Sequence, residues 1–249
     1  MNKQTIAVWF SCGAASAVAA KKTIEIYGDT HNIRIINNPV LEEDEDNRRF
    51  LKDVESWLGV EIETAINPKY PNGSIVEVFD RRKYMSGVAG APCTKELKKN
   101  ARYEWEKNNH ADHHVLGFTL DEVSRHERFI KTERPLIPVL IDAELTKGDC
   151  FSIINKAGIK LPRVYSMGYP NANCIGCVKS QSPTYWNHVR RHHPDIFDQR
   201  VEQSSRIGAK LVRVKGERIF LKDLDQNAVG RPMKDLNFEC GLFCEEYGK

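Results

Sequence analysis

Paired cysteines are the residues of this chain whose types and spacing are most informative about chemistry. Cys174 and Cys177 form a C-x-x-C, and Cys240 and Cys244 form a C-x-x-x-C near the end of the sequence. Two thiolates at such a spacing can reach one centre, as in zinc and iron–sulfur proteins. Cys93, ahead of a basic stretch, is a further ligand or an activated thiolate. We therefore expect metal ligands among Cys93, Cys174, Cys177, Cys240 and Cys244.

Other cysteines and histidines have different expected roles. Cys240 has a second interpretation as a mobile nucleophile on a terminal segment. Cys12 and Cys150 have no cysteine partner nearby in the sequence, and we expect Cys150 to pack in a core. The histidine pairs at 113–114 and 192–193 are predicted to be structural or to contact phosphate, because adjacent side chains point apart.

The first residues of the chain predict a strand, a loop of small residues and a helix. Residues 6–10 are apolar, residues 11–16 are all small, and helix-forming residues follow. This order places backbone N–H groups at a helix N-terminus facing a bound phosphate, and serine hydroxyls can add donors. No Gly-Lys-Ser/Thr ends the loop, which excludes a Walker P-loop; an ordinary strand-to-helix turn is the alternative. The predicted phosphate-binding residues are Ser11, Cys12, Gly13, Ala14, Ala15 and Ser16.

A second loop, residues 117–125, follows another predicted strand and carries two charged residues three apart. Glu122 and Arg125 would either pair with each other or present the arginine to a phosphate. An ion pair on the surface contributes little energy. The basic residues Arg128, Lys131 and Arg134 extend the positive patch.

An acidic run at residues 42–46 precedes a segment with helical periodicity, residues 48–58. We expect these acids in the first helical turn, where the helix dipole favours negative charge. Binding of Mg²⁺ is the alternative, because carboxylates are its usual protein ligands.

Composition sets broad limits on the class of protein. The chain has 249 residues, of which 41% are hydrophobic, and a formal net charge of +3. A mild positive excess suits anionic small molecules but does not demonstrate binding of nucleic acid. No run is long and apolar enough to span a membrane, and the first residues lack a signal-peptide pattern. We expect a cytoplasmic protein without disulfides.

Strands alternate with helices over some 150 residues, which predicts an α/β fold with a doubly wound, mostly parallel sheet. Ligands of such sheets lie at the carboxyl ends of the strands, so Asn38, Gly117, Glu122 and Arg125 join the predicted nucleotide site. We expect a nucleotide-binding domain at 1–165 and a Cys-rich C-terminal region at 166–249. The expected strands are 6–10, 33–36, 60–63, 114–117, 136–141, 211–214 and 219–221, and the expected helices are 17–27, 48–58, 75–84, 94–107, 185–193 and 197–207.

Together, these motifs resemble the phosphoadenosine-phosphosulfate (PAPS) reductase family of the adenine nucleotide alpha-hydrolase, or PP-loop ATP pyrophosphatase, superfamily. The resemblance covers nearly the whole chain. Residues 11–16 stand where the family has its Ser-Gly-Gly-x-Asp-Ser loop, and residues 117–125 are similar to its Gly-x-x-x-x-Glu-x-x-Arg loop. Residues 173–179 look like the C-x-x-C of members with an iron–sulfur cluster. Residues 239–242 resemble the terminal Glu-Cys-Gly-Leu-His segment, whose cysteine attacks sulfur in true reductases.

The resemblance implies a HUP-type fold that binds ATP or a sulfated adenine nucleotide, and a [4Fe–4S] cluster. The implied ligands are Cys93, Cys174 and Cys177, completed by Cys240 or Cys244. Zinc held by Cys174, Cys177, Cys240 and Cys244 is the alternative. The compact form looks like stand-alone members found in phage.

The chain departs from the family pattern at several positions. Cys12 replaces a loop glycine, Ala15 replaces the family's Asp, and Phe243 replaces the His of the terminal segment. Thr94 stands where cluster-bearing reductases have a second, adjacent cysteine. These departures favour a diverged reaction, whereas the retained Glu-Cys-Gly-Leu favours reduction.

Three functions remain open from the sequence. In a sulfonucleotide reductase, a Cys240 thiolate would attack the sulfuryl sulfur, release sulfite and be reset by a thioredoxin-like dithiol. A diverged ATP pyrophosphatase would adenylate or thiolate a nucleic-acid or small-molecule acceptor and release pyrophosphate, with Mg²⁺ as a further expected ion. A non-catalytic nucleotide and iron–sulfur subunit is the third. A homodimer is left open as the assembly, and no membrane partner is expected.

Overall fold

The computed structural model describes residues 3–87, 90–131 and 136–236. These residues form two compact units, each built from segments that are separate in the sequence. The first unit takes the described residues of Met1–Pro39, Glu45–Ile66 and Ala101–Arg163, and the second takes those of Val40–Asp44, Asn67–Asn100 and Val164–Lys249. No helix in the described part of the chain is long and apolar enough to cross a membrane.

The first unit contains a four-stranded, fully parallel sheet in the order β3-β2-β1-β4. This confirms the prediction of an α/β fold with a parallel, doubly wound sheet. Residues 6–10 of the inner strand β1 are all apolar and buried, as expected for a parallel strand with helices on both faces of the sheet. The strands are β1 (Thr5–Phe10), β2 (Asn32–Asn37), β3 (Ile62–Thr64) and β4 (His113–Val115).

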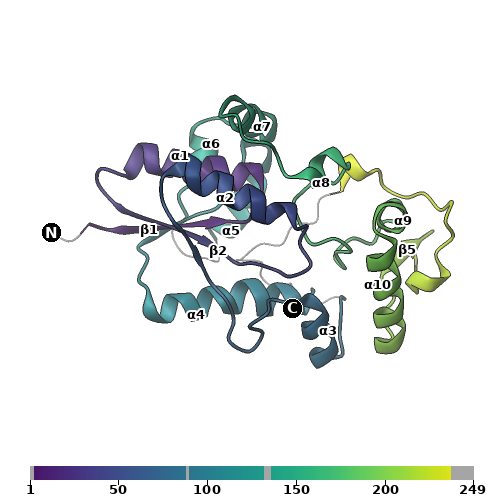
Figure 1. Cartoon of the computed structure of the whole chain (residues 1–249). Coiled ribbons are helices and arrows are strands. Elements are labelled where there is room, and N and C mark those ends of the chain that lie inside the picture. The colour runs from purple at the N-terminus through teal and green to yellow at the C-terminus, as the bar shows by residue number, and fades with distance from the viewer. Residues whose placement is uncertain (1–2, 88–89, 132–135, 237–249) are drawn as a thin grey trace. The chain divides into compact units, whose positions relative to one another are not determined.

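Helices cover both faces of this sheet. Figure 1 shows α1 and α2 on one face and α4 on the other. Alternate side chains of β1 supply the two cores: Val8 and Phe10 pack with α1 and α2, whereas the Trp9 ring lies 5.6 Å from the Trp105 ring of α4. The helices of this unit are α1 (Ala14–Tyr27), α2 (Asp46–Leu58), α4 (Asn100–Asn108), α5 (Val123–Phe129), α6 (Val139–Asp142) and α7 (Lys147–Lys156).

The predicted strand at 136–141 is wrong. Leu136 makes one isolated parallel bridge to His114, and Ile137 N donates to His114 O at 2.9 Å. Pro138 has no N–H and cannot continue the ladder. The chain turns into the short helix α6 at the next residue. The apolar run was therefore a buried helical turn, which periodicity alone does not separate from a strand.

The predicted helix at 94–107 is divided in the structure. Residues Thr94–Lys99 form a π-helical turn, and α4 begins at Asn100. The acidic run is also placed differently from the prediction, because only Asp46 lies in the first turn of α2.

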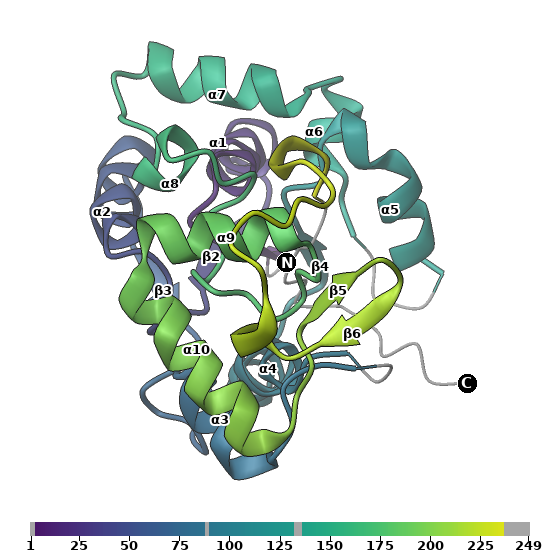
Figure 2. The ribbon, with the colours of Figure 1, turned by 90° about the vertical axis from the view of Figure 1, so that its right-hand side faces the viewer.

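The described part of the second unit contains helices and an antiparallel hairpin. Figure 2 shows α10 running from the end of α9 toward α3, with the hairpin β5–β6 beside them. Gln203 of α10 joins α10 to α3, because its Nε2 donates to Val76 O at 2.9 Å and to Asp80 Oδ1 at 3.1 Å. The elements are α3 (Ile75–Arg82), α9 (Pro183–His192), α10 (Pro194–Ile207), β5 (Val212–Val214) and β6 (Glu217–Ile219), and α8 (Arg163–Ser166) starts at the boundary between the units.

We predict that the free energy of unfolding falls as the pH is lowered through 6, in part because of His188. Burial lowers the pKa of His188, and His192, whose ring centroid lies 4.3 Å away, lowers it further. The unfolded chain, with a histidine pKa of about 6.5, therefore binds the proton more readily than the folded chain. The stability contributed by neutral His188 is complete above about pH 6.5 and is lost as the pH falls toward the folded pKa.

Urea unfolding of wild type and His188→Gln between pH 5 and 8 measures this effect. The variant should show a shallower dependence of stability on pH over the acidic half of the range. His126 has a pKa lowered mainly by burial as well, so part of the slope should remain. Identical slopes for the two proteins would contradict the prediction.

Candidate functional site

Ser16, whose hydroxyl was predicted to donate a hydrogen bond to a bound phosphate, stabilises the loop after β1. The Oγ of Ser16 accepts hydrogen bonds from Ser11 N at 3.1 Å and from Ser11 Oγ at 3.2 Å, and it donates to Gly13 O at 2.9 Å. Within the described residues, no side chain caps the N-terminus of α1, and its first turn carries no acid. The backbone N–H groups of that turn are therefore left to a ligand or to water.

Cys12 has a left-handed backbone conformation that glycine adopts most easily. Its φ of +57° lies in the left-handed region, which costs a residue with a side chain roughly 1–2 kcal/mol. Asn37, the last residue of β2, donates from Nδ2 to Phe10 O at 2.8 Å and to Cys12 Sγ at 3.6 Å. Asn38 was the residue predicted for this site, but Asn38 Nδ2 donates to Ala65 O at 3.0 Å. Asn37 was missed, although a polar residue ending a buried strand was a usable signal.

The loops after β1 and β4 meet at the point where the sheet topology reverses. The chain continues from β1 to β2 on one side, whereas β4 lies on the other, and ligands of such sheets bind outside this junction. Gly117 lies against the first turn of α1: a Cβ added there would be 2.7 Å from Ser16 N and 2.9 Å from Ser16 Cα. The structure thus brings Gly117 to residues 11–16.

Glu122 and Arg125 form the ion pair that was one of the two predicted alternatives. Arg125 Nη1 lies 2.6 Å from Glu122 Oε1, and the guanidinium lies over the Phe118 ring at 5.0 Å. Glu122 also completes a capping box with Thr119 at the start of the helical segment. The contacts of Glu122 in the structure are therefore local ones that order the loop.

The described cysteines with predicted metal roles all belong to the second unit. Cys93 and Cys177 are buried in its hydrophobic core, and Cys174 packs against the same core. The C-x-x-C loop is held by two backbone donors: Ile175 N donates to Glu42 O at 3.1 Å, and Cys177 N donates to Tyr185 Oη at 2.7 Å.

The metal prediction is not tested by these contacts. In the described ranges, no three His, Cys, Asp or Glu side chains form a group that could hold a metal ion. Cys240 and Cys244, and with them the predicted nucleophile, lie outside the described residues, as does Arg134.

Arg200 is a charged residue beside these cysteines that sequence reasoning missed. It is fully buried in α10, and its Nη1 donates to Gln203 Oε1 at 3.0 Å. Its Nε and Nη2 have no hydrogen-bond partner among the described residues. A Cβ added at Gly176 would lie 3.6 Å from Arg200 Nε. The available signal was its spacing of three residues from Phe197 on the apolar face of α10.

The direction of the pKa shift of Arg200 agrees with its burial beside the C-x-x-C loop. Burial lowers the pKa of its guanidinium, and Glu42, Cys174, Tyr185 and Cys93 each act to raise it. Cysteine sulfur is the soft donor that binds an iron–sulfur cluster or zinc, and the C-x-x-C loop lies against a buried, incompletely paired cation that suits such an anionic group. The chemistry of the side chains therefore fits the group that the sequence predicts.

The acidic run makes contacts within the protein. Glu42 caps α3, since its carboxylate accepts from Ser74 Oγ at 2.7 Å and from Ile75 N at 2.9 Å. Hydrogen bonds from Arg49 lower the pKa of Asp46 to about 2. These contacts occupy carboxylates that were candidates for Mg²⁺.

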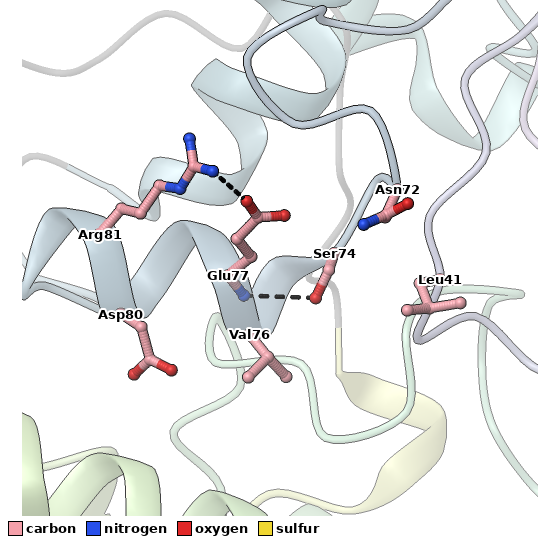
Figure 3. A pocket seen from close by; sticks show the side chains of 7 residues that line it. All are labelled: Leu41, Asn72, Ser74, Val76, Glu77, Asp80 and Arg81. Carbon is pink, nitrogen blue, oxygen red and sulfur yellow. Dashed lines mark hydrogen bonds and ion pairs between the residues drawn. The ribbon is translucent and has the colours of Figure 1, made fainter.

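A pocket of about 580 Å³ lies along α3 in the second unit. Figure 3 shows Glu77 and Arg81, which form an ion pair at 2.5 Å, and the Ser74 hydroxyl, which caps Glu77 N. None of the predicted site residues lines this pocket, whose lining residues are Leu41, Asn72, Ser74, Val76, Glu77, Asp80 and Arg81.

Comparison with known proteins leaves the family open. No family model and no curated protein matches the sequence. Among solved structures, the chain is similar to the U34-tRNA thiolase NcsA from Methanococcus maripaludis with its [4Fe-4S] cluster, at 14% identity and a TM-score of 0.44. The match covers 87% of this chain and 74% of that chain. Membership of the PAPS reductase family therefore stays a prediction.

Proposed function

We propose that the protein is a PP-loop type enzyme that uses ATP to activate an acceptor and that holds an iron–sulfur cluster through Cys93, Cys174 and Cys177. One observation carries the proposal. Cys93 and the C-x-x-C loop come from distant parts of the sequence, yet their cysteines belong to or pack against one hydrophobic core, and the loop lies against the buried Arg200 side chain at Gly176. Packing alone gives little reason to gather three cysteines in one core, whereas binding of a metal group does.

The nucleotide is assigned to the carboxyl ends of β1 and β4. The N-terminus of α1 offers backbone N–H groups and the positive end of a helix dipole at the junction where sheets of this type bind ligands. Gly117 lets the second loop lie directly on this turn, and Ser16 fixes the shape of the first loop. These features suit a polyphosphate chain.

In the proposed reaction, an oxygen of the acceptor attacks the α-phosphorus of ATP. The bond from that phosphorus to the bridging oxygen breaks, pyrophosphate leaves with the electron pair, and the acceptor is adenylated. The N–H groups of the first turn of α1 would hold phosphate oxygens and oppose the charge that accumulates on them. A bound cluster would supply sulfide-level sulfur, which would replace the adenylate on the acceptor with AMP as the leaving group.

Sulfonucleotide reduction is the second candidate, favoured by the Glu-Cys-Gly-Leu sequence at 239–242. In that reaction the Cys240 thiolate attacks the sulfuryl sulfur of PAPS and the nucleotide leaves. A thioredoxin-like dithiol then releases sulfite and regenerates the thiolate.

Anaerobically purified protein tests both candidates through iron, sulfide and zinc analysis and two product assays. We expect about four irons per chain, the content of one [4Fe–4S] cluster. We further expect pyrophosphate from ATP with an RNA or small-molecule acceptor, unchanged by Cys240→Ser. Sulfite from PAPS and thioredoxin, abolished by Cys240→Ser, would instead establish reduction. Nucleotide binding without either product would indicate a non-catalytic subunit, and one zinc without iron would contradict the cluster.

Ser16→Ala tests the nucleotide site separately. Loss of the hydroxyl removes the hydrogen bonds that brace the loop, and we expect ATP affinity to fall about tenfold, the effect of about 1.4 kcal/mol. Ser56→Ala is the matched control, since Ser56 Oγ donates only within α2 to Lys52 O at 3.0 Å. Equal affinities for the two variants, measured by calorimetric titration, would place the nucleotide elsewhere.

A further inference from the structure

Arg200 is a buried cation. Among the described residues its hydrogen bond is to a neutral acceptor and not to an anion. Its side chain is fully buried, and Nη1 donates to the neutral amide oxygen of Gln203. Nε and Nη2 are buried without a hydrogen-bond partner in the described part of the chain. Burial of a charged group with a single neutral acceptor is unfavourable, because the group loses its hydration without gaining an opposite charge. The position of Arg200 therefore implies an anionic partner for its remaining N–H groups.

The candidates for this partner are the anionic groups that act on Arg200. These are the Glu42 carboxylate and the thiols of Cys174 and Cys93, in addition to the Tyr185 hydroxyl. The two Glu42 oxygens already accept from Ser74 Oγ, Ile75 N and Val76 N at the start of α3. The Tyr185 hydroxyl accepts from Cys177 N at 2.7 Å. The cysteine segment that lies against the guanidinium is the C-x-x-C loop, because a Cβ added at Gly176 would be 3.6 Å from Arg200 Nε.

The guanidinium is held beside the C-x-x-C loop by contacts on two sides. Gln203 Nε2 is fixed by Val76 O and Asp80 Oδ1, so Gln203 Oε1 has a set direction toward Arg200. On the other side, Gly176 has a φ of +71°, and a Cβ there would lie 3.4 Å from Arg200 Cγ. The loop can approach the arginine stem this closely because Gly176 has no side chain.

We propose that Arg200 is a positioning residue for the cysteine-ligated cluster: its buried guanidinium donates to the cysteine sulfurs and offsets their negative charge. This inference rests on the cluster of the proposed function. Hydrogen bonds to the sulfurs and nearby charge are the means by which proteins adjust the reduction potential of such clusters. Arg200 would favour the reduced state, because reduction adds a negative charge next to a fixed positive one.

The test compares the cluster in wild type, Arg200→Met and Arg200→Gln, each as the full chain reconstituted anaerobically with iron and sulfide. Redox titration followed by visible absorption or electron paramagnetic resonance gives the midpoint potential. At the wild-type midpoint, we expect the ratio of reduced to oxidised cluster to fall about tenfold or more in both variants, the effect of losing one charge at a dielectric constant of about 20. In Arg200→Lys, which keeps the positive charge, the ratio of reduced to oxidised cluster should fall less.

Arg190→Met is the matched control. Arg190 also belongs to the second unit, donates to Asn187 Oδ1 and Leu224 O, and lies over the Phe197 ring at 4.3 Å. Its loss should lower stability and leave the midpoint potential unchanged. Wild-type potentials in folded, loaded Arg200→Met and Arg200→Gln would overturn the role of Arg200 while leaving the cluster established. Wild-type protein that takes up no iron would overturn the proposed cluster and this role together.

If neither Arg200→Met nor Arg200→Gln folds, a second measurement on wild type and Arg200→Lys tests the role of Arg200. Wild-type apoprotein is reconstituted in D₂O, and the iron–sulfur stretching bands are compared by resonance Raman spectroscopy with those of Arg200→Lys. Shifts on deuteration that are larger in wild type support N–H donation from Arg200. Identical shifts in the two proteins would contradict it.

Discussion

Serine in place of Cys174 or Cys177 is expected to remove most of the iron from the reconstituted protein. A serine hydroxyl is not deprotonated near neutral pH and is a poor ligand for iron, whereas a cysteine thiolate binds it strongly. We expect the iron content to fall from about four per chain to below about one. Cys93→Ser should behave in the same way. Iron and sulfide analysis, together with the visible absorption of the cluster, measures the loss.

Cys150→Ala is the matched control for these variants. Cys150 is fully buried in α7 of the first unit, and burial together with Asp149 raises the pKa of its thiol to about 12. It is therefore a neutral packing residue at physiological pH. Its loss should reduce the free energy of unfolding by about 1 kcal/mol and leave the iron content unchanged. Full iron content in Cys174→Ser and Cys177→Ser would contradict the assignment of these ligands.

Alanine in place of Gly117 is expected to disrupt the nucleotide site. The added Cβ would lie 2.7 Å from Ser16 N and 2.9 Å from Ser16 Cα, both backbone atoms of the first turn of α1. Backbone cannot move aside as a flexible side chain does, so the loop or the helix must shift. We expect a loss of about 1–3 kcal/mol in stability and a fall of at least about tenfold in ATP affinity.

Gly148→Ala provides the comparison for Gly117→Ala. A Cβ at Gly148 would meet only Thr146 Oγ1, at 3.7 Å, which is ordinary van der Waals contact. Alanine also restricts the unfolded chain, so stability should be unchanged or slightly higher. Calorimetric titration with ATP and thermal unfolding of both variants give the two quantities. Wild-type affinity in folded Gly117→Ala would show that the phosphates do not bind at the first turn of α1.

Cys12 lies in the same loop, residues 11–16, and has both a strained backbone and a hydrogen bond from the neighbouring strand. The residue stands where the resembled family has glycine, and its positive φ shows why glycine suits that position. Asn37 contributes a hydrogen bond to this conformation from the neighbouring strand. Cys12 therefore adds a thiol to the loop at a position where the backbone has a positive φ.

Local sequence determined most of the secondary structure and the class of fold. Apolar runs marked β1 and β2, and helical periodicity marked α2 and α10, because each pattern reports which faces of one element are buried. Alternation of these elements was enough to predict a parallel sheet. The short apolar run at 136–141 was assigned to the wrong element, since a buried strand and a buried helical turn have the same composition.

Only the tertiary structure decided which side chains meet. Cys93 and the C-x-x-C loop are far apart in the sequence, and nothing in local spacing indicates that they share one core or that the loop lies against the buried Arg200. The choice between Asn37 and Asn38 likewise depends on which carbonyl each amide reaches after the strands have paired. Periodicity describes one element at a time, whereas a site depends on the packing between elements. The residue types indicated the kind of chemistry, and the tertiary structure determined which side chains lie beside the residues that carry it.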